Sequence, residues 1–397
     1  MFRGKTDLPA ALRTRPPRTI LVVVTRRIGD VLLATPLIRS LKSAWPGTAV
    51  DCLVFEGTQG VLAGNPDLRS ILTVPLRPTR GQHLRLLLRI ARRYDLALSA
   101  LPSDRPTLYA ALAGRCSAGL ALAGPKHAWK RALLTRWTYL ADRTDHAVAS
   151  VLHLARLLGI EEQPAVVASW SKADEHALAA ALPFATESAR YAVLHLYPKF
   201  RYKQWTAQGW SELAAWLGAH GLTIVVTGGG APDELAYAEG LVRAFPENTV
   251  NLCGKLSFSQ VACLISRAAL YVGPDTGTTH LAAATGTPTI ALFGPSNPVR
   301  WGPWPAGYAS IESPYALRGS RTVGNVTLLQ GEKHCVPCLE EGCERHVASR
   351  SDCLEEMPAA RVIEAAARAL RSNPAQRANQ RTGGDQRQQV HARAPDQ

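Results

Sequence analysis

The sequence contains no apolar run as long as the ~18 residues that a membrane-spanning helix requires. Its first 18 residues are rich in Arg and Pro and lack the apolar segment of a secretory signal. The 397 residues include eight cysteines, and without an export signal this number favours reduced thiols over a disulfide scaffold. We therefore expect a cytoplasmic protein with two domains of roughly 150–200 residues each.

The sequence also lacks the short motifs that mark several enzyme classes. It has no Gly-x-Gly-x-x-Gly loop for a dinucleotide, no Walker A loop, no His-Glu-x-x-His pair and no Gly-x-Ser-x-Gly elbow. An Asp-x-Asp pair that could hold a metal ion on a diphosphate is absent as well. A bound phosphate would therefore be neutralised by Lys, Arg and backbone N–H groups.

The positive charge of the chain is concentrated in its first half. Residues 1–170 contain 24 Lys and Arg against 11 Asp and Glu, whereas residues 171–397 contain 21 against 20. Such a field favours an acidic partner, either a phosphorylated substrate, an anionic membrane surface or nucleic acid, although solvated Arg-rich helices would produce the same excess. The basic residues are not interleaved with aromatic ones, which disfavours a nucleic-acid partner.

Short apolar strands alternate with helical segments in both halves of the chain. This pattern predicts βαβ units and hence two α/β domains with parallel sheets. The expected strands are residues 19–24, 49–55, 70–74, 191–196, 222–227, 270–272 and 289–293, and the expected helices include 31–45, 207–219 and 277–285. We divide the chain into a flexible extension (1–18), a first domain (19–170), a second domain (171–372) and a disordered tail (373–397).

The first motif follows the strand at residues 19–24 and contains Gly29 and Asp30. Ligands of open α/β sheets bind beyond the carboxyl ends of the strands, so a carboxylate there can act as a general base on a substrate hydroxyl. Asp is also a common N-cap residue, and Asp30 in that role would serve only to start the following helix.

The second motif runs from Asp275 through Thr276 and Gly277 to His280, again directly after an expected strand. Asp275 or Thr276 can cap a helix whose free N–H groups bind an anion, and Gly277 permits a close approach. His280, about one turn further on, can donate a hydrogen bond to a phosphate or sugar oxygen. A capped helix with a surface histidine is the alternative, but the crowding of these side chains favours a diphosphate site.

Two weaker signals lie between these motifs. Lys199, Arg201 and Lys203 follow the strand at 191–196 and could neutralise a leaving pyrophosphate, although alone they would suggest a solvated loop. The glycine-rich turn at residues 228–230 precedes the acidic Glu234, which could accept from ribose hydroxyls.

Four of the cysteines lie close together, at Cys335, Cys338, Cys343 and Cys353. A Cys-x-x-Cys pair is a usual zinc knuckle, but the other two spacings match no common zinc finger. The spacing therefore leaves open either a structural metal site or a loop of unreactive thiols, and it favours the loop.

Taken in order, the motifs resemble those of the heptosyltransferases of glycosyltransferase family 9. The resemblance rests on Arg27-Ile28-Gly29-Asp30-Val31-Leu32-Leu33 with Thr35-Pro36-Leu37, on Asp275-Thr276-Gly277 with His280-Leu281-Ala282-Ala283-Ala284, and on Gly286-Thr287-Pro288, Leu292-Phe293-Gly294-Pro295 and Trp301-Gly302-Pro303. It runs over roughly residues 19 to 370 and includes the cysteine-rich segment.

This resemblance implies a GT-B fold, in which two Rossmann-like domains face each other across a cleft. It implies inverting transfer of a heptose from ADP-heptose to the lipopolysaccharide inner core, with no cofactor and no catalytic metal. The first domain would hold the lipid-linked anionic acceptor beside the inner face of the membrane, and the second domain would hold the donor.

The resemblance also implies roles for individual residues. Asp30 would be the general base, and Asp275 would contact the heptose. The diphosphate would be held by Lys203, Thr276, Gly277 and His280, with Glu234 near the ribose and Leu256 near the adenine. Pro198 and Lys199 stand where some members carry hydroxyl residues, so Lys199 or Arg201 would replace that contact. A related transferase for another nucleotide sugar, or a non-catalytic nucleotide-sugar-binding protein, remains an alternative.

Overall fold

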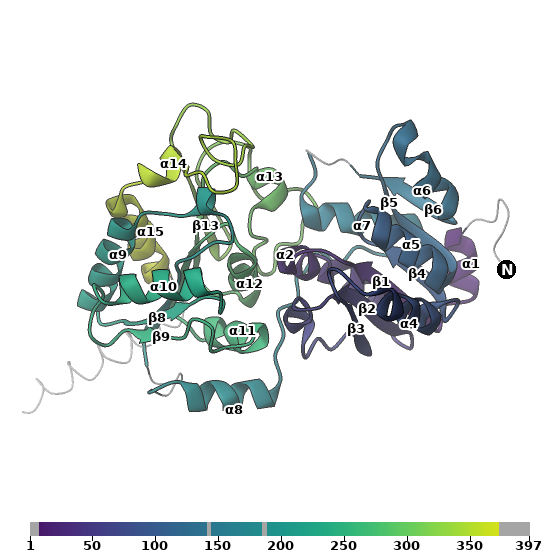
Figure 1. The fold of residues 1–397 in the computed structure, drawn as a ribbon, viewed down its shortest axis with the longest axis horizontal. Coiled ribbons are helices and arrows are strands. Elements are labelled where there is room, and N and C mark those ends of the chain that lie inside the picture. The colour runs from purple at the N-terminus through teal and green to yellow at the C-terminus, as the bar shows by residue number, and fades with distance from the viewer. Residues whose placement is uncertain (1–7, 141–143, 185–188, 373–397) are drawn as a thin grey trace, which may run out of the picture.

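The computed structural model describes residues 8–140, 144–184 and 189–372. Two α/β domains lie side by side, an N-terminal one in purple to blue and a C-terminal one in teal to yellow (Figure 1). The expected disordered tail at residues 373–397 and the first seven residues of the chain lie outside the described residues. The chain passes between the domains in the segment that precedes helix α8.

The N-terminal domain is built on a six-stranded parallel sheet in the order β3-β2-β1-β4-β5-β6. Its central strand β1 consists of apolar, mostly β-branched residues that are covered on both faces, as is usual for parallel strands. Its strands are β1 Thr19–Val24, β2 Ala49–Phe55, β3 Ser70–Val74, β4 Tyr94–Ser99, β5 Gly114–Ala121 and β6 Arg136–Tyr139. Its helices are α1 Leu8–Thr14, α2 Ile28–Leu32, α3 Thr35–Ala44, η1 Gln59–Leu62, α4 Arg80–Ile90, α5 Asp104–Ala113, η2 Pro125–His127, α6 Ala128–Leu133 and α7 Ala147–Leu158.

The C-terminal domain repeats this design with a seven-stranded sheet in the order β12-β13-β11-β10-β7-β8-β9. Its strands are β7 Tyr191–His195, β8 Thr223–Thr227, β9 Val250–Asn251, β10 Leu270–Pro274, β11 Thr289–Phe293, β12 Arg321–Val323 and β13 Val326–Gln330. Its helices are α8 Lys172–Ala181, η3 Arg201–Lys203, α9 Ala207–Ala219, α10 Pro232–Val242, α11 Phe258–Ser266, α12 Gly277–Thr285, α13 Pro298–Trp301, α14 Asp352–Glu355 and α15 Ala359–Ser372. The edge strand β12 is antiparallel to β13, a departure from the purely parallel sheets that the sequence predicts.

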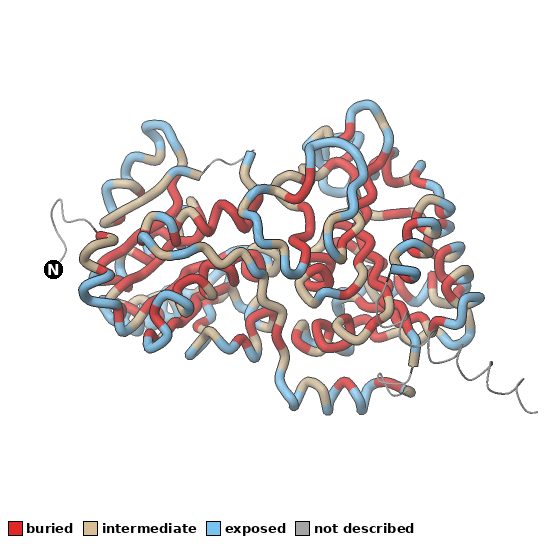
Figure 2. Tube along the Cα trace, turned by 180° about the vertical axis from the view of Figure 1, so that it is seen from behind, coloured by how far each residue is buried: buried red, intermediate tan, exposed pale blue. Residues whose placement is uncertain are grey.

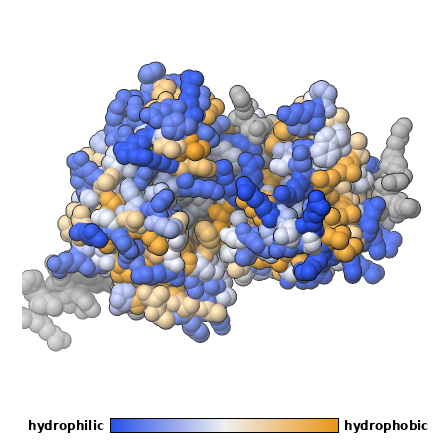
Figure 3. Space-filling view, viewed as in Figure 1, coloured by the Kyte–Doolittle hydropathy of each residue, from blue (hydrophilic) through white to orange (hydrophobic). Residues whose placement is uncertain are grey.

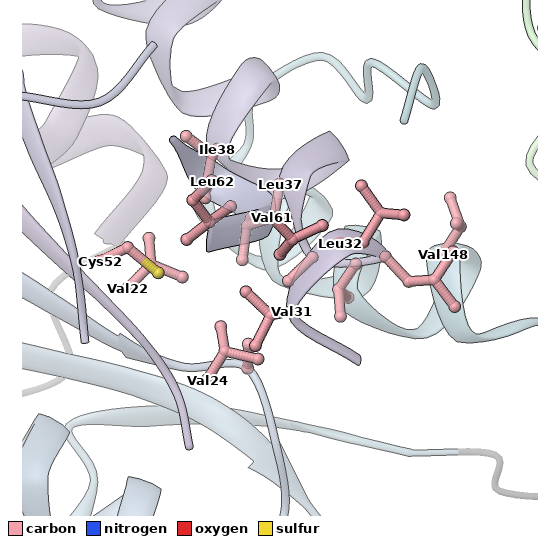
Figure 4. Close-up of a cluster of buried hydrophobic side chains, with 14 of the residues drawn as sticks. Val22, Val24, Val31, Leu32, Leu37, Ile38, Cys52, Val61, Leu62 and Val148 are labelled. Carbon is pink, nitrogen blue, oxygen red and sulfur yellow. The ribbon is translucent and has the colours of Figure 1, made fainter. Parts of the chain in front are cut away.

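Buried residues, drawn in red in Figure 2, run through the interior of both domains, and most of them are apolar. On one face of the N-terminal sheet, α4 and α5 contribute Leu86, Ile90 and Tyr109 to a core. On the opposite face, a larger core continues into the C-terminal domain and contains Leu281 of α12. Figure 4 shows part of this second core beneath the first motif, with Val22, Val24, Val31, Leu32, Leu37, Ile38, Cys52, Val61, Leu62 and Val148 labelled.

In both sheets the strand order changes direction near the middle of the sheet, and the two sequence motifs lie at these points. The order changes between β1 and β4 in the first sheet and between β7 and β10 in the second. Crevices form at such reversals beyond the carboxyl ends of the strands. Asp30 lies after β1, and residues 275–277 lie after β10, so both sequence motifs are placed at a crevice. This two-domain arrangement confirms the expected GT-B fold.

Two local predictions differ from the structure. The expected helix at residues 31–45 is divided into α2 and α3, because Pro36 has no N–H group and its ring would clash with the carbonyl of Leu32 in a continuous helix. Residues 8–14, expected within a flexible extension, instead form α1. Its Leu8 and Leu12 are buried, and the helix packs on α7. Within the described residues, no helix combines the length and apolar character needed to cross a membrane.

Candidate functional site

The two motifs meet in a cavity of about 640 Å³ between the domains, within the size range of small-molecule sites. Among the residues that line it are seven of those predicted from the sequence: Asp30, Lys199, Lys203, Asp275, Thr276, Gly277 and His280. They come from the ends of β1, β7 and β10, which are far apart in the sequence. The fold therefore assembles these residues in one place, although Arg201 is not among the lining residues.

Asp30 lies in the first turn of α2, where its side chain is mostly buried. The N-cap of this helix is Arg27, so the structure excludes the interpretation of Asp30 as an N-cap. Burial raises the pKa of the Asp30 carboxyl above its ordinary value, although Arg26, Arg27 and Arg300 act in the opposite direction. The Nε atom of Arg26 lies 3.5 Å from Oδ2 of Asp30. A carboxylate with a raised pKa at the wall of a cleft is suited to accept a proton near neutral pH.

A second cavity also borders Asp30; most of its lining residues belong to the N-terminal domain, and we call it the N-terminal cavity. It lies where the strand order reverses between β1 and β4, and apolar residues line it together with Arg26, Lys130 and Arg300. Asp30 lines both cavities and therefore lies where molecules bound in the two would meet. The Nζ atom of Lys130 donates to the carbonyl of Pro102 at 2.8 Å, which holds this cation at the cavity wall.

The start of α12 forms the opposite wall of the larger cavity. Thr276 is its N-cap, and the Thr276 hydroxyl accepts from the Thr279 N–H. Gly277 lies close to α2. A β-carbon added to it would lie only 2.6 Å from Cγ2 of Ile28. Burial lowers the pKa of His280 to about 4, so its imidazole is neutral at physiological pH. Its buried Nδ1 has no hydrogen-bond partner among the described residues.

An ion pair joins the second motif to the loop after β7. The Nζ atom of Lys203 lies 2.5 Å from Oδ2 of Asp275, and both side chains are largely buried. Burial alone would raise the pKa of Asp275, but Lys203, His280 and Ser296 outweigh it, and the pKa lies below its ordinary value. Asp275 is therefore ionised, and Lys203 brings a positive charge to the cavity.

Two predicted donor contacts, Glu234 and Leu256, are not among the residues that line this cavity. Glu234 is in the first turn of α10, and its Oε1 accepts from the Gly229 N–H at 2.6 Å. Leu256 is partly buried and packs against the larger core.

The four clustered cysteines are free thiols, and Cys353 is buried. Burial raises the pKa of the Cys353 thiol to about 12, and the neighbouring Cys338, Cys343 and Cys335 act in the same direction. Across the described ranges, no three His, Cys, Asp or Glu side chains are arranged to hold a metal ion. Cys353 packs beside Gly294, and the metal site that the cysteine spacing leaves open stays a prediction.

Several lining residues were given no role by the sequence analysis. Arg300 of α13 belongs to the C-terminal domain, yet its guanidinium lies at the N-terminal cavity and donates to the Asp145 carbonyl at 3.2 Å. The guanidinium of Arg27 lies 4.8 Å from the ring centre of Phe200, a cation–π contact between the domains. Nothing in the local pattern around Arg300 signals its role, because that role depends on the approach of the two domains.

Comparison with known proteins gives a consistent result. The chain is 28% identical over 287 residues to lipopolysaccharide heptosyltransferase 3 of Escherichia coli, covering 70% of this chain and 83% of that protein. It is 28% identical over 343 residues to lipopolysaccharide heptosyltransferase 1 of Pseudomonas aeruginosa, covering 82% and 87%. The fold is similar to that of the E. coli ADP-heptose lps heptosyltransferase II, with a TM-score of 0.67 at 18% identity over 89% of this chain and 98% of that one.

The sequence also matches the model of a protein family over residues 85–321, more than half of its length. The family is described as glycosyltransferase family 9 (heptosyltransferase). This match, together with the fold and the two motifs at the cleft, shows that the chain is a glycosyltransferase and belongs to glycosyltransferase family 9.

Proposed function

We propose that this enzyme transfers a heptose from ADP-heptose to the inner core of lipopolysaccharide, with inversion at the anomeric carbon. The acceptor would be lipid A–Kdo or an already heptosylated core. Membership of the family and the names of the relatives support this donor and this class of acceptor. The observation that carries the mechanism is the position of Asp30, which borders both cavities.

In the proposed reaction, Asp30 accepts the proton of an acceptor hydroxyl bound in the N-terminal cavity. The hydroxyl oxygen then bonds to the anomeric carbon of the donor, while the bond from that carbon to the diphosphate oxygen breaks. A single displacement of this kind inverts the configuration and requires one base and a stabilised leaving group. The raised pKa of Asp30 brings its basicity closer to what the proton transfer requires.

The leaving ADP gains negative charge, and the C-terminal motif is suited to stabilise it. Lys203 supplies a cation, and the first turn of α12, with its N-cap Thr276, lines the cavity, where free N–H groups of a helix start can bind an anion. Neutral His280 can donate a hydrogen bond to a phosphate oxygen. Asp275 would hold Lys203 in place before the donor binds and would contact the heptose afterwards. Lys199 adds a second cation to this wall, whereas Glu234 remains a proposed ribose contact and Leu256 a proposed adenine contact.

The N-terminal cavity fits an anionic sugar. Its apolar wall can cover a sugar ring, and the cations Arg26, Lys130 and Arg300 line it, although the buried Lys130 also pairs with Asp104. Arg300 comes from the C-terminal domain, so binding of an anionic acceptor would hold the two domains together. This arrangement couples acceptor binding to formation of the complete site.

The test is ADP release from ADP-heptose by the purified protein in EDTA, with and without a lipid A–Kdo acceptor. We expect release that requires the acceptor. Asp30→Asn should lower transfer about 100-fold or more while ADP binding persists, because only the base is lost. Glu239→Gln, which removes an exposed carboxylate from α10, is the matched control and should transfer normally.

The other outcomes separate the alternatives. Binding of ADP-heptose without release would indicate a different acceptor or a non-catalytic binding protein. Absence of binding would indicate another nucleotide sugar, and a panel of such donors would identify it. Near-normal transfer by Asp30→Asn would refute the assignment of the base without affecting that of the substrates.

A further inference from the structure

We propose that helices α4, α5 and α6 form a surface that docks on an anionic lipid bilayer. The helices pack one against the next along one side of the N-terminal domain (Figure 1). They lie within residues 76–140, a stretch that contains 12 Lys and Arg but only two Asp and no Glu. This stretch therefore holds most of the +14 net charge of the chain.

Exposed leucines lie on the outer side of α4. Leu84 and Leu88 are 57% and 66% exposed, and they are one helical turn apart. The buried residues of the same helix, Leu86 and Ile90, lie on its opposite side, because positions two apart are about 200° apart around a helix. Leu84 and Leu88 therefore point away from the protein core.

The same arrangement recurs on the neighbouring helices. Leu108 and Leu112 are exposed on α5, and Trp129 and Leu133 are exposed on α6, each pair again one turn apart. Figure 3 shows apolar atoms in orange among hydrophilic atoms in blue on the outer surface of this domain. Exposed apolar side chains that recur on adjacent elements mark an interaction surface rather than scattered exposure.

The charges beside these leucines identify the partner as anionic. Arg85 and Arg89 are exposed next to Leu84 and Leu88 on α4. Within the described part of the chain neither arginine takes part in an ion pair, so both guanidinium groups can bind lipid phosphates. Leucines that enter the acyl boundary and arginines that reach the headgroups are the two components of an interfacial membrane contact.

The position of this surface explains why a bilayer is favoured over a protein partner. Pro102 and Ser103 precede α5, and Lys130 belongs to α6, yet all three line the cavity that ends at Asp30. Docking of the helices would bring this cavity close to the lipid surface, where a lipid-linked acceptor is held. That last step rests on the proposed function, whereas vesicle binding by the surface does not.

Flotation of the full chain with vesicles tests the proposal. We expect binding to phosphatidylcholine vesicles that contain phosphatidylglycerol, weaker binding as salt increases, and little binding to phosphatidylcholine alone. Arg85→Gln with Arg89→Gln should weaken binding about 30-fold, which corresponds to about 1 kcal/mol per charge. Leu84→Glu with Leu88→Glu should reduce binding further. Each variant should unfold at the temperature of the unchanged protein, because these side chains are exposed.

Matched substitutions on the C-terminal domain provide the control. Arg243→Gln with Arg318→Gln removes the same charge from exposed positions, and Leu317→Glu replaces a leucine that is also exposed. These variants should bind vesicles as the unchanged protein does. Equal losses in both sets would show that net charge alone attracts the protein, and this would refute a specific surface.

Failure of this proposal can be distinguished from failure of the proposed function. Transfer to a lipid-free core acceptor should be unaffected by the α4 variants, while transfer to an acceptor embedded in vesicles should fall. Vesicle binding without any transfer would support the docking surface and contradict the proposed activity. Transfer without vesicle binding would overturn the docking proposal and indicate a protein partner for this surface.

Discussion

Gly29 and Gly277 face each other across the boundary between the domains. A β-carbon on Gly29 would lie 3.7 Å from Cα of Gly277, and one on Gly277 would lie 3.4 Å from the Gly29 nitrogen. The two sequence motifs are thus in contact through their glycines, although 247 residues separate them. The absence of side chains at both positions lets α2 and the start of α12 approach, and the larger cavity forms beside this contact.

Gly277→Ala should disturb this contact, because the new methyl group would lie 2.6 Å from Cγ2 of Ile28. Overpacking of this kind costs about 1–3 kcal/mol, so we expect kcat/KM for transfer to fall about tenfold or more. Adding Ile28→Ala should restore much of the activity by removing the clashing group. Gly240→Ala, in α10 with open space around it, is the control and should leave transfer unchanged. Failure of the Ile28 rescue would mean that the methyl group acts by blocking the ligand instead.

Arg26→Gln should move the acidic limb of the pH–rate profile to higher pH. Burial raises the pKa of Asp30 and Arg26 lowers it, so removal of the guanidinium raises it further. Because the proposed base must be ionised, activity falls as the pH drops through this pKa, and a higher pKa moves that fall upward. The profile of kcat/KM should be compared with that of Arg15→Gln, which removes an exposed charge near α1. An unshifted limb for Arg26→Gln would contradict the role of Asp30.

Lys203→Met should weaken ADP binding and also destabilise the protein. The substitution leaves Asp275 buried without its cation, and such a loss costs about 3–5 kcal/mol. In the double variant Lys203→Met with Asp275→Asn, stability should return while ADP affinity stays low, because the cation for the diphosphate is still missing. Thermal unfolding and titration calorimetry measure the two effects separately. Recovery of ADP affinity in the double variant would show that Lys203 acts only on the fold.

We expect His146 to make the stability of the protein sensitive to acid. Its Nδ1 accepts from the Val148 N–H at 3.1 Å, and its Nε2 lies 2.8 Å from the Gly302 carbonyl in the other domain. Burial lowers the pKa of His146 to about 3, so the unfolded chain, with an ordinary pKa near 6.5, binds more protons between these values. Its contribution to stability is therefore complete above pH ~6.5 and is lost as the pH falls towards 3.

Titration of unfolding by denaturant between pH 7 and pH 4 measures this effect. Each such histidine lowers the free energy of unfolding by up to about 1.4 kcal/mol per pH unit. His195 and His280 contribute in the same direction, since burial lowers the pKa of each to about 4. The variant His146→Gln should be less stable at pH 7 and should show a shallower slope. A slope equal to that of the unchanged protein would contradict this account.

Most of the strands and helices that the sequence predicts are observed, although they are a minority of the elements in the fold. The runs at residues 19–24, 49–55, 70–74 and 289–293 are observed as strands with the same limits, and the helix at 207–219 is observed as α9. Buried parallel strands are short, apolar and β-branched, so their pattern is local. The division between α2 and α3 could also have been predicted locally, from Pro36. The burial of Leu8 and Leu12 against α7 could not, because it depends on residues far away in the sequence.

The sequence by itself determined the two motifs and their chemical types: a carboxylate after β1, and a capped, glycine-containing helix start after β10. Only the tertiary structure decided which other residues join them. Arg300 reaches the N-terminal cavity, while Glu234 and Leu256 lie outside the larger one. Local patterns report backbone preference and burial within a few residues. The position of Arg300 at the N-terminal cavity, in contrast, depends on how the two domains approach each other. Contacts between residues far apart in the chain determine that approach.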